Sequence, residues 1–350
     1  MRTLSLVGRL LAACVVAAPC LAAGTAAARE PESARVVLDE GLRAYTPVAG
    51  VTGTVRSMGS GTMNNLMAHW SELFRRYYPN VKVEVEGKGS NTGPTALTES
   101  QAQFAPMSRA MEPAEIDAFR AKFGYEPTEL RVGIDCVAIY VHRDNPLQSI
   151  TLEQLERIYS VAGPDMTWDQ VGVTDPAFAG RPISLYGRDS ASGTARFFRE
   201  HALRNKAYKP GVKEQAGAAG PVQAVAGDRF GIGYSSIGYQ TANVRKVPVL
   251  VEGSPEPVMP GAETAYSGEY PLARFLYVYI NHDQRRALDP LRAEFVRLMF
   301  SREGQESVIK DGYVPITAAI ADEDLARVGL LGEDAARSDG SGAAPVTAGQ

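Results

Sequence analysis

The feature that most constrains this chain is a unit that recurs along it: a short strand, a loop of glycine and hydroxyl residues, and then a helix. The clearest loop is Gly-Arg-Asp-Ser-Ala-Ser-Gly-Thr at 187–194, which follows a strand expected at 182–186 and precedes a helix expected at about 195–206. The loop Gly-Ser-Gly-Thr at 59–62 has the same setting. The first N–H groups of a helix have no partner inside it, and the helix dipole makes that end positive. The sequence therefore predicts an α/β protein whose loops hold an anion.

The order of the first elements predicts a parallel sheet. A strand is expected at 52–56 and an amphipathic helix from Met63. The valines of 81–85 then alternate with charged residues, as in a half-buried strand. Strand–helix–strand units of this kind form right-handed parallel crossovers, and ligands in such sheets bind beyond the carboxyl ends of the strands. Two further segments end strands in this way, Gly-Lys-Gly-Ser-Asn-Thr-Gly at 87–93 and Phe104 to Arg109, so we expect three loops to converge on one ligand.

The strand, loop and helix order is repeated over 143–250, so we expect a second α/β lobe there. Thr151, three residues before Gln154, is typical of a capping box and predicts a helix start. The remaining elements expected are helices at about 94–100, 113–122, 151–159, 222–226, 287–300 and 303–311, and strands at 136–141, 231–239 and 275–280.

The start of the chain predicts export. Arg2 and Arg9 precede the apolar run 10–18, and small-residue cleavage sites follow, so residues 1–28 form a signal peptide in this interpretation. The alternative is a lipoprotein box ending at Cys14, but Arg9 leaves it a short apolar core. We therefore expect a periplasmic protein, with a lipid anchor as the less favoured alternative. The polar segment 29–50 is expected to be a leader arm, and the tail 331–350 to be disordered.

Composition excludes several classes of protein. With 45% hydrophobic and 22% charged residues and a net charge of -4, the chain is neither a membrane bundle nor a nucleic-acid binder with a basic surface. Only Cys136 lies outside the signal peptide, so no disulfide within the mature chain and no cysteine zinc site are expected. The four histidines are scattered without ligand-like spacing. We expect no metal and no cofactor.

The loops and their order resemble the periplasmic phosphate-binding proteins of phosphate ABC transporters, which are type II periplasmic solute-binding proteins. The resemblance covers about residues 52–318. Each matching motif is weak alone, and the order and spacing of the motifs together make the resemblance specific. These motifs are Gly59–Thr62, Gly89–Gly93, Ser108-Arg109, Thr151–Tyr159 with Thr167-Trp168, Arg188–Thr194, Gly231–Tyr234 and Gly312–Pro315.

The resemblance implies a two-lobed α/β fold of the periplasmic-binding-protein type II, with a ligand cleft between lobes that close by a hinge. Lobe I is then 51–142 plus 256–330, and lobe II is 143–255. It also implies that the protein captures inorganic phosphate, passes it to a membrane permease, and acts as a monomer.

The resemblance further implies a set of phosphate-binding residues. Hydroxyls, helix N–H groups and a guanidinium suit a dianion that has lost its water. The implied residues are Thr62 and the backbone of Met63, Ser90, Ser108 with Arg109, Arg188, Ser192, Gly193 and Thr194, to which we add the neighbours Ser60 and Thr92.

One position departs from the family pattern. Well-known members carry an aspartate that accepts the proton of hydrogen phosphate, whereas this chain has Arg109 after Ser108. Asp135 and Asp189 are the alternative acceptors. Arg109 itself either contacts the anion or pairs with a carboxylate of the opposite lobe.

An enzyme is the competing class. The loop at 187–194 lacks the Gly-x-Ser-x-Gly pattern of a nucleophile, no Ser–His–Asp set is apparent, and Lys88 lacks the spacing of a phosphate loop. We therefore expect a binding protein without catalytic residues. Two alternatives remain on the same fold: a binder of sulfate or molybdate, and an exported adhesive or matrix protein.

Overall fold

The computed structural model describes residues 36–331, and these fall within one compact unit of the chain. The first strand–helix–strand unit forms as predicted: β1 (Gly53–Met58), α1 (Asn64–Tyr77) and β2 (Val81–Glu86). The two strands pair in parallel. The helical spacing of the apolar residues of α1 buries Leu66, Trp70 and Phe74 on one face.

Nine of the strands form one sheet in the order β2-β1-β3-β11-β4-β8-β6-β7, with β9 pairing to β4, and β5 and β10 pair in a separate two-stranded sheet. The outer strands pair in parallel, β1 with β2 and β3, and β6 with β7 and β8, as predicted. The central strands β4 and β11 are antiparallel to each other and to their neighbours β3, β8 and β9. β4 has fifteen residues, far more than the expected strand at 136–141. The bounds are β3 Phe104–Met107, β4 Thr128–His142, β6 Ser184–Arg188, β7 Lys213–Gln215, β8 Gly231–Ser236, β9 Val244–Val247 and β11 Ala273–Ile280.

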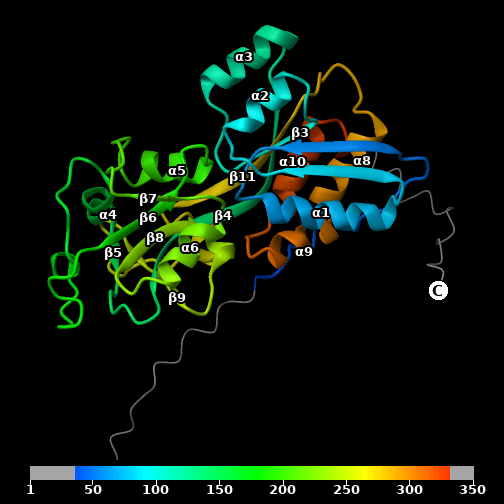
Figure 1. Cartoon of the computed structure of the whole chain (residues 1–350). Coiled ribbons are helices and arrows are strands. Elements are labelled where there is room, and N and C mark those ends of the chain that lie inside the picture. The colour runs from blue at the N-terminus through cyan, green and yellow to red at the C-terminus, as the bar shows by residue number, and fades with distance from the viewer. Residues whose placement is uncertain (1–35, 332–350) are drawn as a thin grey trace, which may run out of the picture. The chain divides into compact units, whose positions relative to one another are not determined.

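Two hydrophobic cores divide the fold into lobes. The first half of β4 packs Leu130 and Val132 into one core, while its second half packs Val137 and Ile139 into the other. The residues of β4 change from one core to the other near residue 135, and those of β11 change near residue 273. In Figure 1, β4 and β11 run between the blue and orange-red elements of lobe I and the green and yellow elements of lobe II.

Helices cover the sheet in both lobes. Those of lobe I are α1, α2 (Thr92–Thr98), α3 (Pro113–Phe123), α8 (Pro290–Phe300), α9 (Arg302–Lys310) and α10 (Ala318–Arg327). Those of lobe II are α4 (Leu152–Tyr159), α5 (Gly193–His201), α6 (Ala219–Ala226) and α7 (Ala262–Tyr266). Shorter elements are β5 (Ile150–Thr151), β10 (Val249–Leu250), η1 (Trp168–Val171) and η2 (Ile237–Tyr239).

Capping residues explain where two helices begin. The Thr151 hydroxyl accepts the Gln154 N–H and the Gln154 side chain accepts the Thr151 N–H, so the predicted capping box is present. Helix α5 starts at Gly193, earlier than expected, because Ser192 caps it. It also ends earlier, at His201, and the turn after it places Arg204 and Asn205 in left-handed backbone conformations.

The N-terminal arm is packed more firmly than expected. Leu42 and Tyr45 are buried in the lobe I core. The Tyr45 hydroxyl lies 2.7 Å from that of Tyr78 and donates to Glu294 at 2.8 Å. This part of the arm is thus a component of lobe I.

Two sequence expectations lie outside the described residues: the signal peptide at 1–28 and nearly all of the tail at 331–350. Between residues 36 and 331, none of the helices combines the length and apolar character that a membrane span requires.

Candidate anion-binding site

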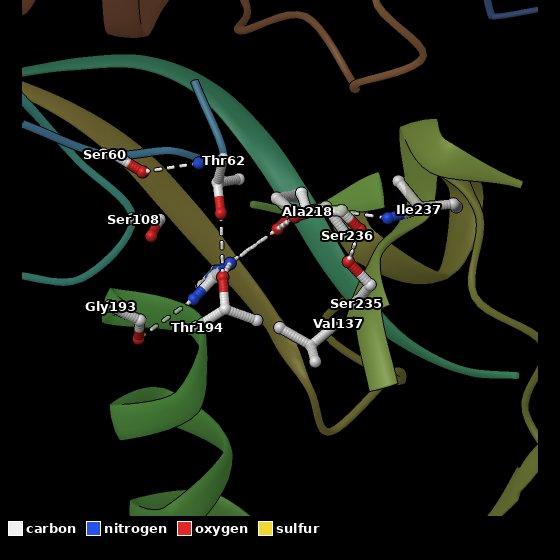
Figure 2. A network of polar contacts seen from close by, with 12 residues as sticks. Ser60, Thr62, Ser108, Val137, Gly193, Thr194, Ala218, Ser235, Ser236 and Ile237 are labelled. Atoms are coloured by element: carbon white, nitrogen blue, oxygen red, sulfur yellow. Dashed lines mark hydrogen bonds and ion pairs between the residues drawn. The ribbon is translucent and has the colours of Figure 1, made fainter. Parts of the chain in front are cut away.

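The loop at 59–62 lies at the carboxyl ends of β2 and β3. Its backbone is held there because Gly59 N–H donates to Glu86 O and Ser60 N–H donates to Pro106 O. A Cβ at Gly59 would lie 2.2 Å from Pro106 O, so only glycine fits. The Ser60 hydroxyl accepts the Thr62 N–H at 3.2 Å, and the Thr62 side chain points toward Thr194 of the other lobe (Figure 2).

The loop at 187–194 presents a matching arrangement from lobe II. The Ser192 hydroxyl caps α5 by accepting the N–H groups of Thr194 and Ala195, at 3.2 and 3.4 Å. Thr194 is thereby fixed in the first turn of the helix and is fully buried. The positive ends of α5 and α1 thus both lie at the contact between the two loops.

The hydroxyls of the two loops meet. Figure 2 shows Thr62 and Thr194 pointing toward each other, with their oxygens 2.8 Å apart. Arg188 donates to the Thr62 oxygen at 3.2 Å. Thr62, Thr194 and Arg188 are therefore brought together, as the sequence predicts, although they come from different lobes.

Ser90 and Ser108 form the neighbouring part of the cluster. Their hydroxyl oxygens are 3.2 Å apart, and Ser90 Oγ accepts the Ser108 N–H at 3.1 Å. Gly193 lies against both, because a Cβ there would be 2.3 Å from Ser90 Oγ and 2.8 Å from Ser108 Oγ. A glycine at 193 is required for this close approach of the two lobes.

Arg188 supplies a buried charge that has no ion-pair partner among the described residues. Its exposed fraction is 3%, and within residues 36–331 no carboxylate oxygen lies within 4.0 Å of its guanidinium. Its Nε, in the same described range, has no hydrogen-bond partner. Burial lowers its pKa from the usual value, yet a guanidinium stays protonated in proteins. A buried cation of this kind favours an anion beside it.

Sequence reasoning missed Arg274 and left the role of Asp135 open. They are cross-strand partners on β11 and β4, with Arg274 Nη2 2.8 Å from Asp135 Oδ2. Arg274 Nη2 also donates to the Thr194 hydroxyl at 2.7 Å, so it reaches the cluster. The available sequence signal for Arg274 was a single arginine just before the apolar strand expected at 275–280. Where its side chain points depends on the pairing of β4 with β11, which the sequence does not show.

The cluster does not include Arg109. Its two Nη atoms donate to the Glu115 carboxylate at 2.8 and 2.6 Å, and Nη2 also donates to Asn91 Oδ1 at 2.8 Å. Glu115 is on α3 of the same lobe, so the pairing with an opposite-lobe carboxylate is also not seen. Such a pair does join the lobes nearby, between Glu112 and Arg196, at 2.7 Å.

The side chains of three other candidate residues make contacts outside the cluster. The Thr92 hydroxyl donates to Gly89 O at 2.9 Å and so supports its own loop. The Met63 side chain is buried in the lobe I core, and only its backbone, at the start of α1, faces the loop. Asp189 Oδ1 accepts the Ala191 N–H, which ties it to the lobe II loop.

The fold and this cluster define a class: a two-lobed solute-binding protein whose lobes meet at a buried, cationic set of hydroxyl and N–H donors. Residues 44–303 match the family model of the PBP superfamily domain. The phosphate-binding protein PstS of Pseudomonas aeruginosa is 42% identical over 316 residues, which are 89% of this chain and 96% of the relative. The chain therefore belongs to the PBP superfamily and, within it, to the family of PstS.

Solved structures support the fold. A putative phosphate ABC transporter substrate-binding protein with bound phosphate from Clostridium perfringens aligns with a TM-score of 0.64 at 23% identity, over 76% of this chain and 100% of that one. An ABC-type phosphate transport receptor from Vibrio cholerae aligns with a TM-score of 0.60 at 22% identity, over 75% and 100%. The two-lobed periplasmic-binding fold expected from the sequence is confirmed.

Proposed function

We propose that this protein is an exported binding protein that captures inorganic phosphate between its lobes and delivers it to the membrane permease of a phosphate ABC transporter. The family supports this proposal, because its relative in Pseudomonas aeruginosa is named a phosphate-binding protein. The observation that carries it is Arg188, a buried cation without a carboxylate partner in the described part of the chain.

The donors around Arg188 suit a tetrahedral oxyanion. Hydroxyls of Thr62 and Thr194 and the N-termini of α1 and α5 face the same point from two lobes. An anion bound there gains charge-assisted hydrogen bonds from both lobes only when they are together. Binding energy is thus available to hold the lobes closed, which supports a capture and delivery cycle.

The same contacts favour binding over catalysis. In residues 36–331 the hydroxyls of Thr62 and Thr194 bond to each other and to arginines rather than to a histidine or carboxylate base. A serine or threonine nucleophile needs such a base within hydrogen-bond reach. We therefore propose a protein without enzymatic activity and with a periplasmic location.

Calorimetric titration of the ligand-stripped mature protein with phosphate, sulfate and molybdate tests the proposal. We expect tight binding of phosphate, and loss of at least 100-fold in affinity, about 2.7 kcal/mol, in Arg188→Gln. The control Arg75→Gln removes an exposed arginine at the other end of α1 and should bind as the wild type does.

Three outcomes count against the proposal. Preference for sulfate or molybdate would keep the site and change the ligand. Normal phosphate affinity in Arg188→Gln would show that the anion does not bind beside Arg188. No binding of any oxyanion by the wild-type protein would overturn the transport function and favour an adhesive or structural role.

A further inference from the structure

We propose that Arg274 is a second anion-binding guanidinium of this site, and that Asp135 positions it from the crossing strands. The inference rests on the proposed function, since it names how the same site holds its anion. It adds one contact residue and one positioning residue to the predicted set.

Asp135 is placed to hold Arg274 rather than to accept a proton from a ligand. Its Oδ2 accepts three hydrogen bonds, from Arg274 Nη2 at 2.8 Å, Arg274 Nε at 3.2 Å and the Ser236 hydroxyl at 2.9 Å. Its Oδ1 accepts the Ile237 N–H at 3.2 Å. A carboxylate has about four acceptor positions, so this one is largely used within the protein. Figure 2 shows Ser236 and Ile237 at this place.

The edge of the Arg274 guanidinium that carries Nη1 and Nη2 faces the hydroxyl cluster. Nη2 donates to Thr194 Oγ1 at 2.7 Å, and Nη1 donates to Gly193 O at 3.4 Å. The guanidinium carbon lies 5.0 Å from the centre of the Phe197 ring on α5. Arg274 thus joins a crossing strand to the first turns of the lobe II helix.

Two guanidinia therefore meet at one pair of hydroxyls. Arg188 contacts Thr62, Arg274 contacts Thr194, and the two threonine oxygens are 2.8 Å apart. Both arginines are buried, and Asp135 compensates the charge of only one. An anion with several oxygens at this point balances the second charge and bonds to both arginines.

The position of Asp135 and Arg274 on the crossing strands β4 and β11 couples the anion to lobe movement. β4 and β11 connect the lobes, and Asp135 and Arg274 are register partners at the point where the cores change. An anion that bonds to Arg274 is thereby tied to the hinge as well as to the two loops.

The alternative is that Asp135 and Arg274 form a purely structural ion pair that does not contact the anion. The double variant Asp135→Asn with Arg274→Gln distinguishes this alternative from an anion-binding role for Arg274. It replaces the pair by two neutral hydrogen-bonding groups and creates no new unpaired buried charge. We expect it to fold and to bind phosphate at least tenfold more weakly than the wild type in calorimetry. The matched control is Arg131→Gln with Asp324→Asn, which removes another ion pair of β4, 2.8 Å long and remote from the cluster, and should bind normally.

Arg274→Lys provides a second test that keeps the charge and the partner of Asp135. A lysine ammonium is too compact to bond to Asp135, Thr194 and an anion at the same time, as the planar guanidinium can. We therefore expect the phosphate affinity of Arg274→Lys to lie between that of the wild type and that of the double variant. Wild-type affinity in a folded double variant would overturn the inference. If the double variant does not fold, wild-type affinity in Arg274→Lys overturns it. No phosphate binding by the wild-type protein would instead overturn the proposed function.

Discussion

Gly238 and Gly312 meet backbone against backbone. A Cβ on Gly312 would lie 2.6 Å from the Cα of Gly238, and a Cβ on Gly238 would lie 2.2 Å from Asp311 O. Gly238 belongs to η2 of lobe II, and Gly312 follows α9 of lobe I. The next residues, Tyr239 and Tyr313, both donate to Thr62 O, at 3.1 and 2.8 Å. The glycine contact therefore sets how closely the lobes approach each other at the loop of residues 59–62.

Gly238→Ala should weaken phosphate binding by preventing full closure. The added methyl group collides with a backbone oxygen, which has no rotamer through which to move away. We expect at least a tenfold loss of affinity in calorimetry and a larger radius of gyration with phosphate in small-angle X-ray scattering. Gly211→Ala is the control, since no atom lies within 4 Å of its Cβ position. Equal affinity and equal compaction in the two variants would show that the contact does not limit closure.

Thr62→Val and Thr194→Val should each reduce phosphate affinity, and their effects should not add. The two hydroxyls bond to each other, so each variant leaves the other hydroxyl without that partner. A double-mutant cycle by calorimetry should give a coupling energy of about 0.5–3 kcal/mol. Thr92→Val should bind nearly as the wild type does, because that hydroxyl bonds to Gly89 O. Simple additivity of the first pair would argue against a shared site.

Arg109→Gln should affect stability rather than phosphate affinity. It removes the buried partner of Glu115 and Asn91, which should lower the free energy of unfolding by about 1–3 kcal/mol in urea denaturation. Phosphate affinity should change by less than about threefold, on the order of 0.6 kcal/mol. A loss as large as that of Arg188→Gln would return Arg109 to the anion-binding set.

Asp311→Asn should change how stability depends on pH. Burial raises the pKa of Asp311 to about 7, whereas an unfolded aspartate titrates near 3.9. Between these values the folded protein holds a proton that the unfolded chain has released, so this group's contribution to stability falls as the pH rises from about 4 to 7. His69 lies 3.9 Å away, and its own pKa is lowered by burial.

Melting temperatures test this prediction. The asparagine carries no charge at any pH, so the variant should equal the wild type near pH 4 and exceed it at pH 8. A constant difference across this range would mean that the Asp311 carboxyl does not titrate there.

The sequence predicts local elements well because their signals are local. The alternating valines of 81–85 and the capping box at Thr151 depend only on neighbouring residues, and both are confirmed. The lengths of β4 and the places where the cores change depend on pairing with residues more than a hundred positions away. No local pattern carries that information. By contrast, α10 does have a local signal, because Thr317 caps it, and this helix was missed.

The site was predicted unevenly for a related reason. Thr62, Ser90, Arg188, Ser192 and Thr194 lie in loops whose residue types already suit an anion, and the fold brings them together. Arg109 sits next to Ser108, which lies in the hydroxyl cluster, yet the long Arg109 side chain turns to Glu115. Conversely, Arg274 lies in no such loop, and only the register of β11 with β4 directs it to the cluster.

The arm at 36–48 has a mechanical consequence. Leu42 and Tyr45 anchor the start of the described chain in lobe I, and α10 packs its end into the same core. Lobe II is thus an insertion, and within residues 36–331 the backbone passes between the lobes through the middle of β4 and the start of β11. We therefore expect a force applied between residues 36 and 331 to pass through lobe I and to unravel it first, while lobe II stays out of the load path until β4 or β11 is pulled away.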